Sequence, residues 1–398
     1  MVIRCAEGLN LSAAGLALMI QVGDTWITPM DYSLPVIDAF RVPMTFSDGV
    51  KRLQATARTP DEWMAMTREI HRLLQLGVLV SDDAPDLAPA RETLPTAKEV
   101  KLHVDLLRDS VRTQVYLAAL KEIVRPGDVV VDIGTGNGVL AMGAARAGAR
   151  HVYAIEANPM GQTTRRIFEA NGFADRITLI QGWSVTVNLP EKADLIVSEI
   201  LSNDVFTENA LQSTRDAERR LLKPGGRVIP TEARIFGRLI TVPDRLRSQR
   251  TVAPGDVADW GRRYGLDFSA LHDAQWHGQM QTWVSPPEVL DGGVLLSEAV
   301  EIGAVQLTHI TSLAYAATAE IVCVRAGRLD GVLGHFDLDV IPGHRMTTDP
   351  LAEARANSWR NPLWFCEPMQ VSAGDRLRLT LIHEHRHPLS VELKIERL

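Results

Sequence analysis

A glycine-rich segment and the acid that ends the next apolar run carry the strongest chemical signal in the sequence. Asp132 precedes Gly134, Gly136 and Gly138, and Glu156 closes the apolar run that follows one helical stretch later. Glycines at this spacing let the backbone turn sharply out of a strand and bring a ligand against the start of the next helix. An acid at the end of the second strand can accept the hydroxyl protons of a ribose. The spacing departs from the G-x-G-x-x-G fingerprint of dinucleotide-binding proteins, and an ordinary strand-to-helix turn is the alternative.

Two glutamates form the second candidate site. Glu199 directly follows the apolar run 194–198, so we expect it at the carboxyl end of a buried strand, beside the glycine-rich turn. With Glu208 it can hold a cationic nitrogen through paired, charge-assisted hydrogen bonds. Glu208 could instead belong to a solvated helical turn, as most glutamates do.

The composition excludes several classes of protein. The chain has 398 residues, of which 45% are hydrophobic and 23% charged, as in folded globular proteins and unlike disordered or fibrous chains. The formal net charge of −7 argues against a general nucleic-acid-binding role. Three widely spaced cysteines form neither a disulfide framework nor a zinc knuckle. No run approaches the ~18 apolar residues of a membrane span and no cleavage-site pattern is clear, so we expect a cytoplasmic protein.

The rhythm of apolar residues divides the chain into three regions. Residues 90–232 alternate apolar runs with helical stretches, which predicts a parallel sheet covered by helices. From 233 to 398, short alternating runs predict an antiparallel β domain. Strands are expected at 129–132, 152–155, 195–197, 376–381 and 391–395.

The first region, 1–82, has the pattern of a small winged-helix module. A turn-rich, acidic stretch at 81–89 follows it and reads as a linker. The expected elements are a strand pair at 16–22 and 25–30, helices at 33–42, 47–53 and 59–76, and a closing strand at 78–80.

The motifs of the second region resemble those of class I S-adenosylmethionine-dependent methyltransferases, and within them the protein arginine methyltransferases. The family-specific segment is 198–208, which is similar to the family's double-glutamate loop and keeps its spacing. The resemblance implies a Rossmann-like, seven-stranded methyltransferase domain over 90–232 and a β-barrel-like substrate domain over 233–398. It also implies that Glu199 and Glu208 orient an acceptor nitrogen toward the methyl group.

The resemblance further implies which residues bind S-adenosylmethionine. His103 and Arg112 lie in a segment similar to the one that closes over the cofactor, and Arg112 would pair with its carboxylate. Ser184 is the candidate adenine contact, because Val185 stands where the family has an acid. The expected cofactor set is His103, Arg112, Asp132, Gly134, Thr135, Gly136, Gly138, Glu156, Ser184 and Glu199, and the expected acceptor set is Glu199, Glu208 and Trp359.

A segment at about 245–285 resembles the family's dimerisation arm. Its most similar part is 260–268, and it implies a head-to-tail homodimer. The alternative is a loop packed on its own β domain.

The departures from the family lie mainly on the acceptor side. Ser358 replaces the histidine that pairs with the family's aspartate, although Asp109 remains, and Ile200 and Asn203 replace a Trp and a Tyr. The Tyr-bearing helix before the cofactor segment is expected to be absent, because 94–100 contains no aromatic residue. Cofactor use should survive these changes, whereas the acceptor could be a guanidinium or a primary amine.

The first 82 residues resemble the small winged-helix recognition elements of ribosomal-peptide biosynthesis. In such elements a leader peptide adds a strand to a sheet edge. A DNA-binding winged helix is the competitor, but Arg68 and Arg72 in its third helix are opposed by Asp61, Glu62 and Glu69. A purely structural cap on the enzyme is a further alternative.

The sequence therefore predicts an S-adenosylmethionine-dependent N-methyltransferase that acts on an arginine guanidinium or a terminal amine of a peptide or protein, in the tailoring of a ribosomally made peptide. Methylation of free arginine or another small amine, and a non-catalytic protein with the cofactor fold, stay open. No membrane, nucleic-acid or metal partner is expected. His383, His385 and His387 share one face of a strand and could bind zinc, but a solvated or interface strand is preferred.

Overall fold

The chain divides into two compact units. In this computed structural model the first unit comprises Met1–Pro95 with the segments Glu156–Thr163 and Ile180–Asn188, and the second comprises the rest. The expected linker at 81–89 lies outside the described residues, apart from Ser81. The structure describes residues 2–398 except 15–16, 23–24, 58–61, 63–65, 67–68, 71, 75, 82–94, 159, 183, 186, 207, 278–279 and 385–389.

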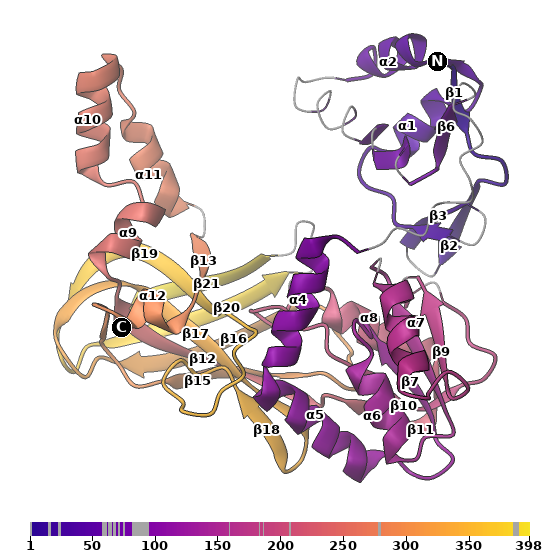
Figure 1. Ribbon diagram of the computed structural model, residues 1–398. Coiled ribbons are helices and arrows are strands. Elements are labelled where there is room, and N and C mark those ends of the chain that lie inside the picture. Colours follow the sequence, from indigo (N-terminus) through magenta and orange to yellow (C-terminus); the bar gives the residue numbers. More distant parts are fainter. Residues whose placement is uncertain are drawn as a thin grey trace. The chain divides into compact units, whose positions relative to one another are not determined.

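The N-terminal region contains two small sheets and short helices (Figure 1). One sheet has the order β5-β1-β6 and the other β2-β3-β4, and all neighbours are antiparallel. Described helical residues also occur between Glu62 and Leu74. The bounds are β1 Val2–Cys5, β2 Asn10–Ala14, β3 Ala17–Val22, β4 Thr25–Ile27, α1 Ser33–Ala39, β5 Met44–Thr45, α2 Phe46–Gln54 and β6 Leu79–Ser81.

Apolar residues from these sheets and helices share one core. Ile3, Ile20, Phe40 and Leu73 are completely buried in it. The expected strand pair is confirmed as β3 and β4, and two of the expected helices as α1 and α2. The expected closing strand is confirmed as β6, whereas β1, β2 and β5 were not predicted. The winged-helix assignment stays a prediction.

A polar network ties the third helical stretch to α1. Arg72 Nε donates to Glu69 Oε2 at 2.7 Å, and its Nη2 donates to Ser33 Oγ at 3.1 Å. Ser33 and Glu69 are buried. A helix that binds DNA needs solvent-facing cations for the phosphates, whereas Arg72 is engaged inside the module. The network therefore disfavours the DNA-binding alternative.

The second unit begins with a parallel sheet of the order β11-β10-β7-β8-β9. The pairs β11–β10, β10–β7 and β7–β8 are parallel, and β7 is buried along its whole length. The expected seven strands are wrong: the described sheet has five, because the chain that leaves β11 continues into the β domain as β12. The bounds are α4 Ala97–Arg108, α5 Ser110–Ile123, β7 Val129–Ile133, α6 Val139–Ala147, β8 His151–Glu156, α7 Gly161–Ala170, β9 Ile177–Gln181, β10 Ala193–Ser198, α8 Ala210–Arg220 and β11 Leu222–Ile229.

Helix α4 contains His103 and no Phe, Tyr or Trp; because the stretch 82–94 before it lies outside the described residues, the absence of a Tyr-bearing helix stays a prediction. Thr96 Oγ1 accepts a hydrogen bond from the Glu99 N–H at 3.3 Å, and the Thr96 N–H donates to Glu99 Oε2 at 2.6 Å. This reciprocal capping box defines the start of the helix. The helix therefore forms without the aromatic residue.

The predicted antiparallel β domain is confirmed as two sheets. The larger has the order β13-β19-β17-β12-β14, with β15 on β12 and β18 on β17, and the smaller has the order β16-β20-β21. Both contribute to one apolar core, for example through Leu239, Val332 and Leu379. The bounds are β12 Glu232–Thr241, α9 Asp244–Arg250, α10 Pro254–Tyr264, α11 Ser269–His277, β13 Gln281–Val284, α12 Pro286–Leu290, β14 Val294–Leu295, β15 Val300–Gln306, β16 Tyr315–Val322, β17 Gly327–Ile341, β18 His344–Thr347, β19 Asn361–Val371, β20 Arg376–Glu384 and β21 Ser390–Arg397.

The expected arm is a helical pair that projects from the β domain (Figure 1). No residue of α10 is buried. Tyr264 and Leu266, at the turn between α10 and α11, are 59% and 61% exposed. A loop packed on its own β domain therefore does not describe this segment.

Of the three alternating histidines, the structure describes only His383. His383 is only 2% exposed, and its ring stacks on the Phe206 ring with 4.6 Å between the ring centroids. It is therefore neither solvated nor an interface residue. His385 and His387 lie outside the described residues. Within the described ranges, no group of three or more His, Cys, Asp or Glu residues could hold a metal ion, and no helix is long and apolar enough to cross a membrane.

Candidate active site

The glycine-rich turn joins β7 to α6, as the sequence predicts. Asp132 is buried near the end of β7, and its Oδ2 accepts a hydrogen bond from Thr135 Oγ1 at 2.6 Å. The N–H groups of Gly134 and Thr135 donate to the Ile155 carbonyl at 2.9 and 3.0 Å, which ties the turn to β8. All three glycines have positive φ angles, between 53° and 81°, which residues with a Cβ rarely adopt.

Side chains from other elements crowd this turn. A Cβ on Gly136 would lie 2.7 Å from His103 Cε1, and a Cβ on Gly134 would overlap Ile200 Cγ2. The turn thus meets both α4 and the segment 199–208, named here the acceptor loop. The structure brings His103, the glycines and this loop together.

Glu156 and Ser184 are buried polar residues of the first unit. Glu156 ends β8, is 3% exposed, and its Oε1 accepts a hydrogen bond from the Asn158 N–H at 2.7 Å. Gln181 Nε2, at the end of β9, donates to the Glu156 carbonyl at 2.8 Å. Ser184 follows three residues later and is also buried.

Arg112 and Glu199 form a buried ion pair in the second unit. Arg112 Nη2 lies 2.5 Å from Glu199 Oε2, and the guanidinium lies 5.6 Å from the centroid of the Trp359 ring. Burial raises the pKa of Glu199 to about 7, although Arg112 opposes the rise, and the charge of Glu208 adds to it. The sequence predicted Arg112 as a cofactor ligand, and its contact with an acceptor glutamate was missed.

Glu208 ends the acceptor loop in a different environment. Its side chain reaches solvent, yet crowding by protein atoms and the charge of Asp204 raise the pKa of its carboxyl. The charge of Glu208 in turn raises the pKa of Glu199. One buried and one exposed carboxylate are therefore available to a cationic group.

Asp109 joins helix α5 to the loop at 357–360. Its Oδ1 accepts a hydrogen bond from the Arg112 N–H at 3.1 Å and so caps α5. Its Oδ2 accepts from the N–H groups of Asn357 and Ser358, both at 2.7 Å, and from Ser358 Oγ at 2.8 Å. Ser358 therefore takes the place at Asp109 that the family fills with a histidine.

The same loop is fastened to the acceptor loop. Trp359 Nε1 donates to the Leu201 carbonyl at 2.8 Å, and the Arg360 N–H donates to Asn203 Oδ1 at 2.7 Å. Trp359 is buried against Phe336, which it meets edge-on. Asn203, where the family has an aromatic residue, thus binds the neighbouring backbone instead.

Two residues near the site were not singled out from the sequence. The Tyr116 hydroxyl on α5 donates to the Ser198 carbonyl at 3.2 Å, and burial holds the pKa of this phenol well above its usual value. Asp204 Oδ1 accepts a hydrogen bond from the Phe206 N–H at 3.0 Å within the acceptor loop. Only Asp204 could have been found from the local sequence, because an aspartate that accepts a hydrogen bond from the N–H two residues later is typical of a tight turn.

The groups around Arg112 fit an anionic ligand. Arg112 Nη1 is buried and has no hydrogen-bond partner among the residues that the structure describes. A guanidinium with one nitrogen on a protein carboxylate and another unused can bind a second carboxylate. The cofactor's methionine carboxylate is a ligand of this kind, and the neighbouring glycine turn allows close backbone approach.

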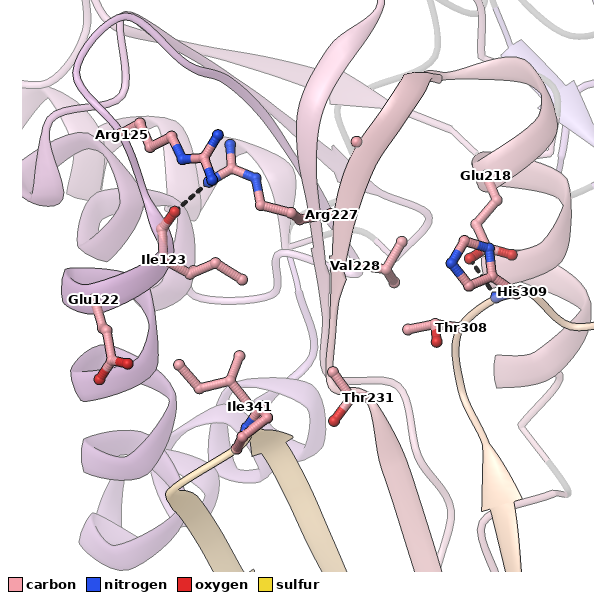
Figure 2. Close-up of a pocket in the computed structure, with 12 residues that line it drawn as sticks. Glu122, Ile123, Arg125, Glu218, Arg227, Val228, Thr231, Thr308, His309 and Ile341 are labelled. Atoms are coloured by element: carbon pink, nitrogen blue, oxygen red, sulfur yellow. Dashed lines mark hydrogen bonds between the residues drawn. The ribbon is translucent and has the colours of Figure 1, made fainter.

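A separate pocket of about 520 Å³ lies between α5, β11 and the β domain (Figure 2). In Figure 2 the guanidinium groups of Arg125 and Arg227 lie side by side at one end, and the His309 N–H donates to Glu218 at 2.7 Å at another. Arg227 is already paired with Asp128 at 2.6 Å. None of the predicted site residues lines this pocket, so it is not the candidate active site.

Comparisons with known proteins place the chain in a family. A family model described as ribosomal protein L11 methyltransferase (PrmA) matches residues 111–231. Protein arginine N-methyltransferase 1 of Chlamydomonas reinhardtii is 28% identical over 280 residues, covering 69% of this chain and 77% of that protein. The arginine N(omega)-methyltransferase of Streptomyces achromogenes subsp. streptozoticus is 30% identical over 344 residues, covering 84% and 88%.

Solved structures agree with this placement. Protein arginine methyltransferase 10 of Arabidopsis thaliana is 26% identical with a TM-score of 0.62, covering 74% of this chain and 92% of that one. The Trypanosoma brucei PRMT1 enzyme-prozyme heterotetrameric complex with AdoHcy is 23% identical with a TM-score of 0.60, covering 74% and 97%, and shares the fold. The chain belongs to the arginine N-methyltransferase family and is an S-adenosylmethionine-dependent methyltransferase.

Proposed function

We propose that this methyltransferase modifies a guanidinium nitrogen of arginine. The observation that carries the proposal is the ion pair of Arg112 with buried Glu199, on the loop that also bears Glu208. Two carboxylates match the planar, forked N–H groups of a guanidinium. A primary amine is the second candidate acceptor, because it can also donate to both carboxylates and the loop lacks the family's aromatic residues at Ile200 and Asn203.

The acceptor carboxylates would act mainly by positioning. S-adenosylmethionine supplies an electrophilic methyl group on its sulfonium. Glu199 and Glu208 hold the acceptor and direct one nitrogen lone pair along the line of displacement. One of the two carboxylates takes the proton that the nitrogen loses as the new N–C bond forms. Arg112 keeps Glu199 in place from the other side.

The proposed cofactor contacts follow the buried polar groups. Arg112 Nη1 and His103 hold the methionine part, and Glu199 lies next to it through the ion pair. Glu156 accepts the ribose hydroxyls and Ser184 contacts the adenine. Asp132 and the turn at Gly134, Thr135, Gly136 and Gly138 supply the surface on which the cofactor lies.

The acceptor molecule is proposed to be a peptide or protein, with free arginine as the second candidate. Most of the reported relatives are named as protein arginine methyltransferases, whereas the Streptomyces relative is named for arginine alone. That match covers 84% of the chain, which is more than Thr96–Leu398 can supply, so it reaches into the N-terminal region. The name of the Streptomyces relative supports free arginine as the second candidate, and Trp359 would line the acceptor site in either case.

The N-terminal region is proposed to bind a leader peptide of a ribosomally made substrate. In the pairing of its described residues, β1 is flanked by β5 and β6, and β6 pairs with β1 alone. An extended peptide could add a strand along β6 through backbone hydrogen bonds. A structural cap remains the competing role.

A homodimer is proposed through the α10–α11 arm. Tyr264 and Leu266 are large apolar residues with more than half of their surface exposed at the tip of the arm. Such residues on a projecting element are typical of an interface. Light scattering of Leu266→Asp against the wild type should show loss of the dimer, and an unchanged mass would reject the arm as interface.

One experiment tests acceptor and peptide role together. The full-length chain is incubated with methyl-labelled S-adenosylmethionine and free arginine, an arginine-containing peptide, or a peptide whose only amine is its N-terminus, and products are located by mass spectrometry. Transfer to arginine that is lost in Glu208→Gln supports the proposal. Transfer to the terminal amine alone, or equal kcat/KM for free arginine and all peptides, would reject the guanidinium or the peptide assignment respectively.

A further inference from the structure

The acceptor loop contains a turn held by its own side chains. Asp204 Oδ1 accepts hydrogen bonds from the Phe206 N–H, at 3.0 Å, and from the Ser202 hydroxyl. The Val205 N–H in turn donates to the Ser202 carbonyl at 3.0 Å. Ser202, Asp204 and Val205 are all buried, so these bonds are protected from competing water.

The turn holds a residue in an unfavourable backbone conformation. Val205 has a φ of 75°, a region that β-branched residues avoid. Such a conformation persists only where the surroundings impose it, and it concentrates near functional sites. The Asp204 hydrogen bonds hold the residues on both sides of Val205, and they impose this conformation together with the bond from the Val205 N–H to the Ser202 carbonyl.

The turn lies on the stretch of chain that joins the two proposed acceptor carboxylates. Asp204 lies between Glu199 and Glu208, four residues before Glu208. Ile200 and Asn203 stand at the two positions of this loop where the resemblance implies aromatic side chains. With those rings absent, the direction of the chain toward Glu208 depends on other restraints.

We propose that Asp204 is a positioning residue of the acceptor site, which braces the turn 202–206 and thereby sets where Glu208 meets the acceptor nitrogen. The proposal rests on the proposed function, since it takes Glu208 as an acceptor ligand. Asp204 itself does not touch the acceptor. Its charge has a second effect, because it raises the pKa of the Glu208 carboxyl.

Two substitutions separate the hydrogen bonds from the charge. Asp204→Asn keeps an oxygen that can accept from the Phe206 N–H and the Ser202 hydroxyl, whereas Asp204→Ala removes it. Ser312→Ala is the matched control, because Ser312 Oγ accepts a hydrogen bond from the Ala314 N–H at 3.1 Å in an exposed loop, also two residues along the chain. Full-length proteins are compared for kcat and KM of the acceptor, for affinity toward S-adenosylhomocysteine, and for hydrogen exchange of the Phe206 amide.

If Asp204 positions the turn, Asp204→Ala should lower kcat about 10- to 100-fold, as expected for a misplaced reacting group. Affinity for S-adenosylhomocysteine should stay within about twofold, and Phe206 amide exchange should accelerate at least about tenfold. Asp204→Asn should restore most of kcat and of the protection, and Ser312→Ala should resemble the wild type. Two results would overturn the positioning role of Asp204. One is a loss of kcat in Asp204→Asn as large as that in Asp204→Ala. The other is an unchanged exchange rate of the Phe206 amide in Asp204→Ala.

The exchange measurement needs no acceptor. If the wild type fails to methylate arginine, the proposed function falls while the Phe206 exchange still decides whether Asp204 holds the loop. If arginine is methylated but the Phe206 amide exchanges at the same rate in Asp204→Ala and the wild type, the proposed function stands and the positioning role of Asp204 is rejected.

Discussion

Arg112 Nη2 lies 2.5 Å from Glu199 Oε2, and this buried pair joins the cofactor side of the site to the acceptor side. The same guanidinium has a second nitrogen with no hydrogen-bond partner in the described part of the chain. Because a buried charge without its partner is costly, Arg112 stabilises the ionised form of Glu199, and a hydrogen bond with the Leu201 backbone adds to this. Under the proposed assignment, cofactor binding and acceptor binding therefore share Arg112.

Substitution of Arg112 should weaken cofactor binding. In Arg112→Ala, loss of the guanidinium removes the donor for the methionine carboxylate, and we expect affinity for S-adenosylhomocysteine to fall about 10- to 100-fold, or ~1.4–2.8 kcal/mol. Isothermal titration calorimetry measures this directly. Glu208→Gln is the control on the acceptor side and should bind within about twofold of the wild type. Equal affinity of Arg112→Ala and wild type would contradict the assignment.

The rate should depend on the ionisation of Glu199. The raised pKa of about 7 means that its carboxylate form, which is proposed to hold the cationic acceptor, gains population as the pH rises through 7. We expect kcat/KM to increase from pH 6 to pH 8 and to level off above. The charge of Glu208 contributes to the raised pKa, so Glu208→Gln should move the titration of Glu199 to lower pH. Carbon-13 NMR of the labelled carboxyl can follow both proteins, and a wild-type midpoint near 4.5 would contradict the expected environment.

The sequence was sufficient for the elements that have a strong local signal. Apolar runs around Val130, Ala154 and Ile196 predicted strands that the structure confirms as β7, β8 and β10. The glycines after Asp132 predicted the turn between β7 and α6, because positive φ angles need glycine.

Other features depend on partners that are distant in the sequence. The contact between Arg112 and Glu199 spans 87 residues, and the bonds from Asp109 to Ser358 span 249. No local pattern encodes such pairs. The burial of His383 was missed for the same reason, since its stacking partner Phe206 belongs to the acceptor loop. The described parallel sheet has five strands and does not include β12, because β12 pairs with the distant strand β17 of the β domain.

Gly136 should be required for cofactor binding for two reasons: its positive φ angle favours glycine, and a side chain at this position would clash with a neighbouring residue. A Cβ there would lie 2.7 Å from His103 Cε1, so Gly136→Ala must displace the His103 ring and should weaken S-adenosylhomocysteine binding at least about tenfold. Gly225→Ala is the matched control, because Gly225 also has a positive φ, of 73°, but nothing lies within 4 Å of its added Cβ. Both variants should lose about 1 kcal/mol of stability from backbone strain. Equal cofactor affinity in the two would show that His103 does not confine the turn.

The Ser358 hydroxyl should contribute to stability through Asp109. Ser358→Ala removes one of the hydrogen bonds to a completely buried carboxylate, and we expect the free energy of unfolding to fall by about 1–2 kcal/mol in urea denaturation. Ser248→Ala is the control, because Ser248 Oγ donates to the Arg245 carbonyl on an exposed helix, where the change should be within about 0.5 kcal/mol.

The remaining Asp109 contacts, from the backbone N–H groups of Arg112, Asn357 and Ser358, should keep the loop 357–360 in place in Ser358→Ala. The activity of Ser358→Ala should therefore fall less than about fivefold, because Ser358 touches Asp109 and neither acceptor carboxylate. A loss as large as that of Glu208→Gln would instead place the Ser358 hydroxyl in the chemistry.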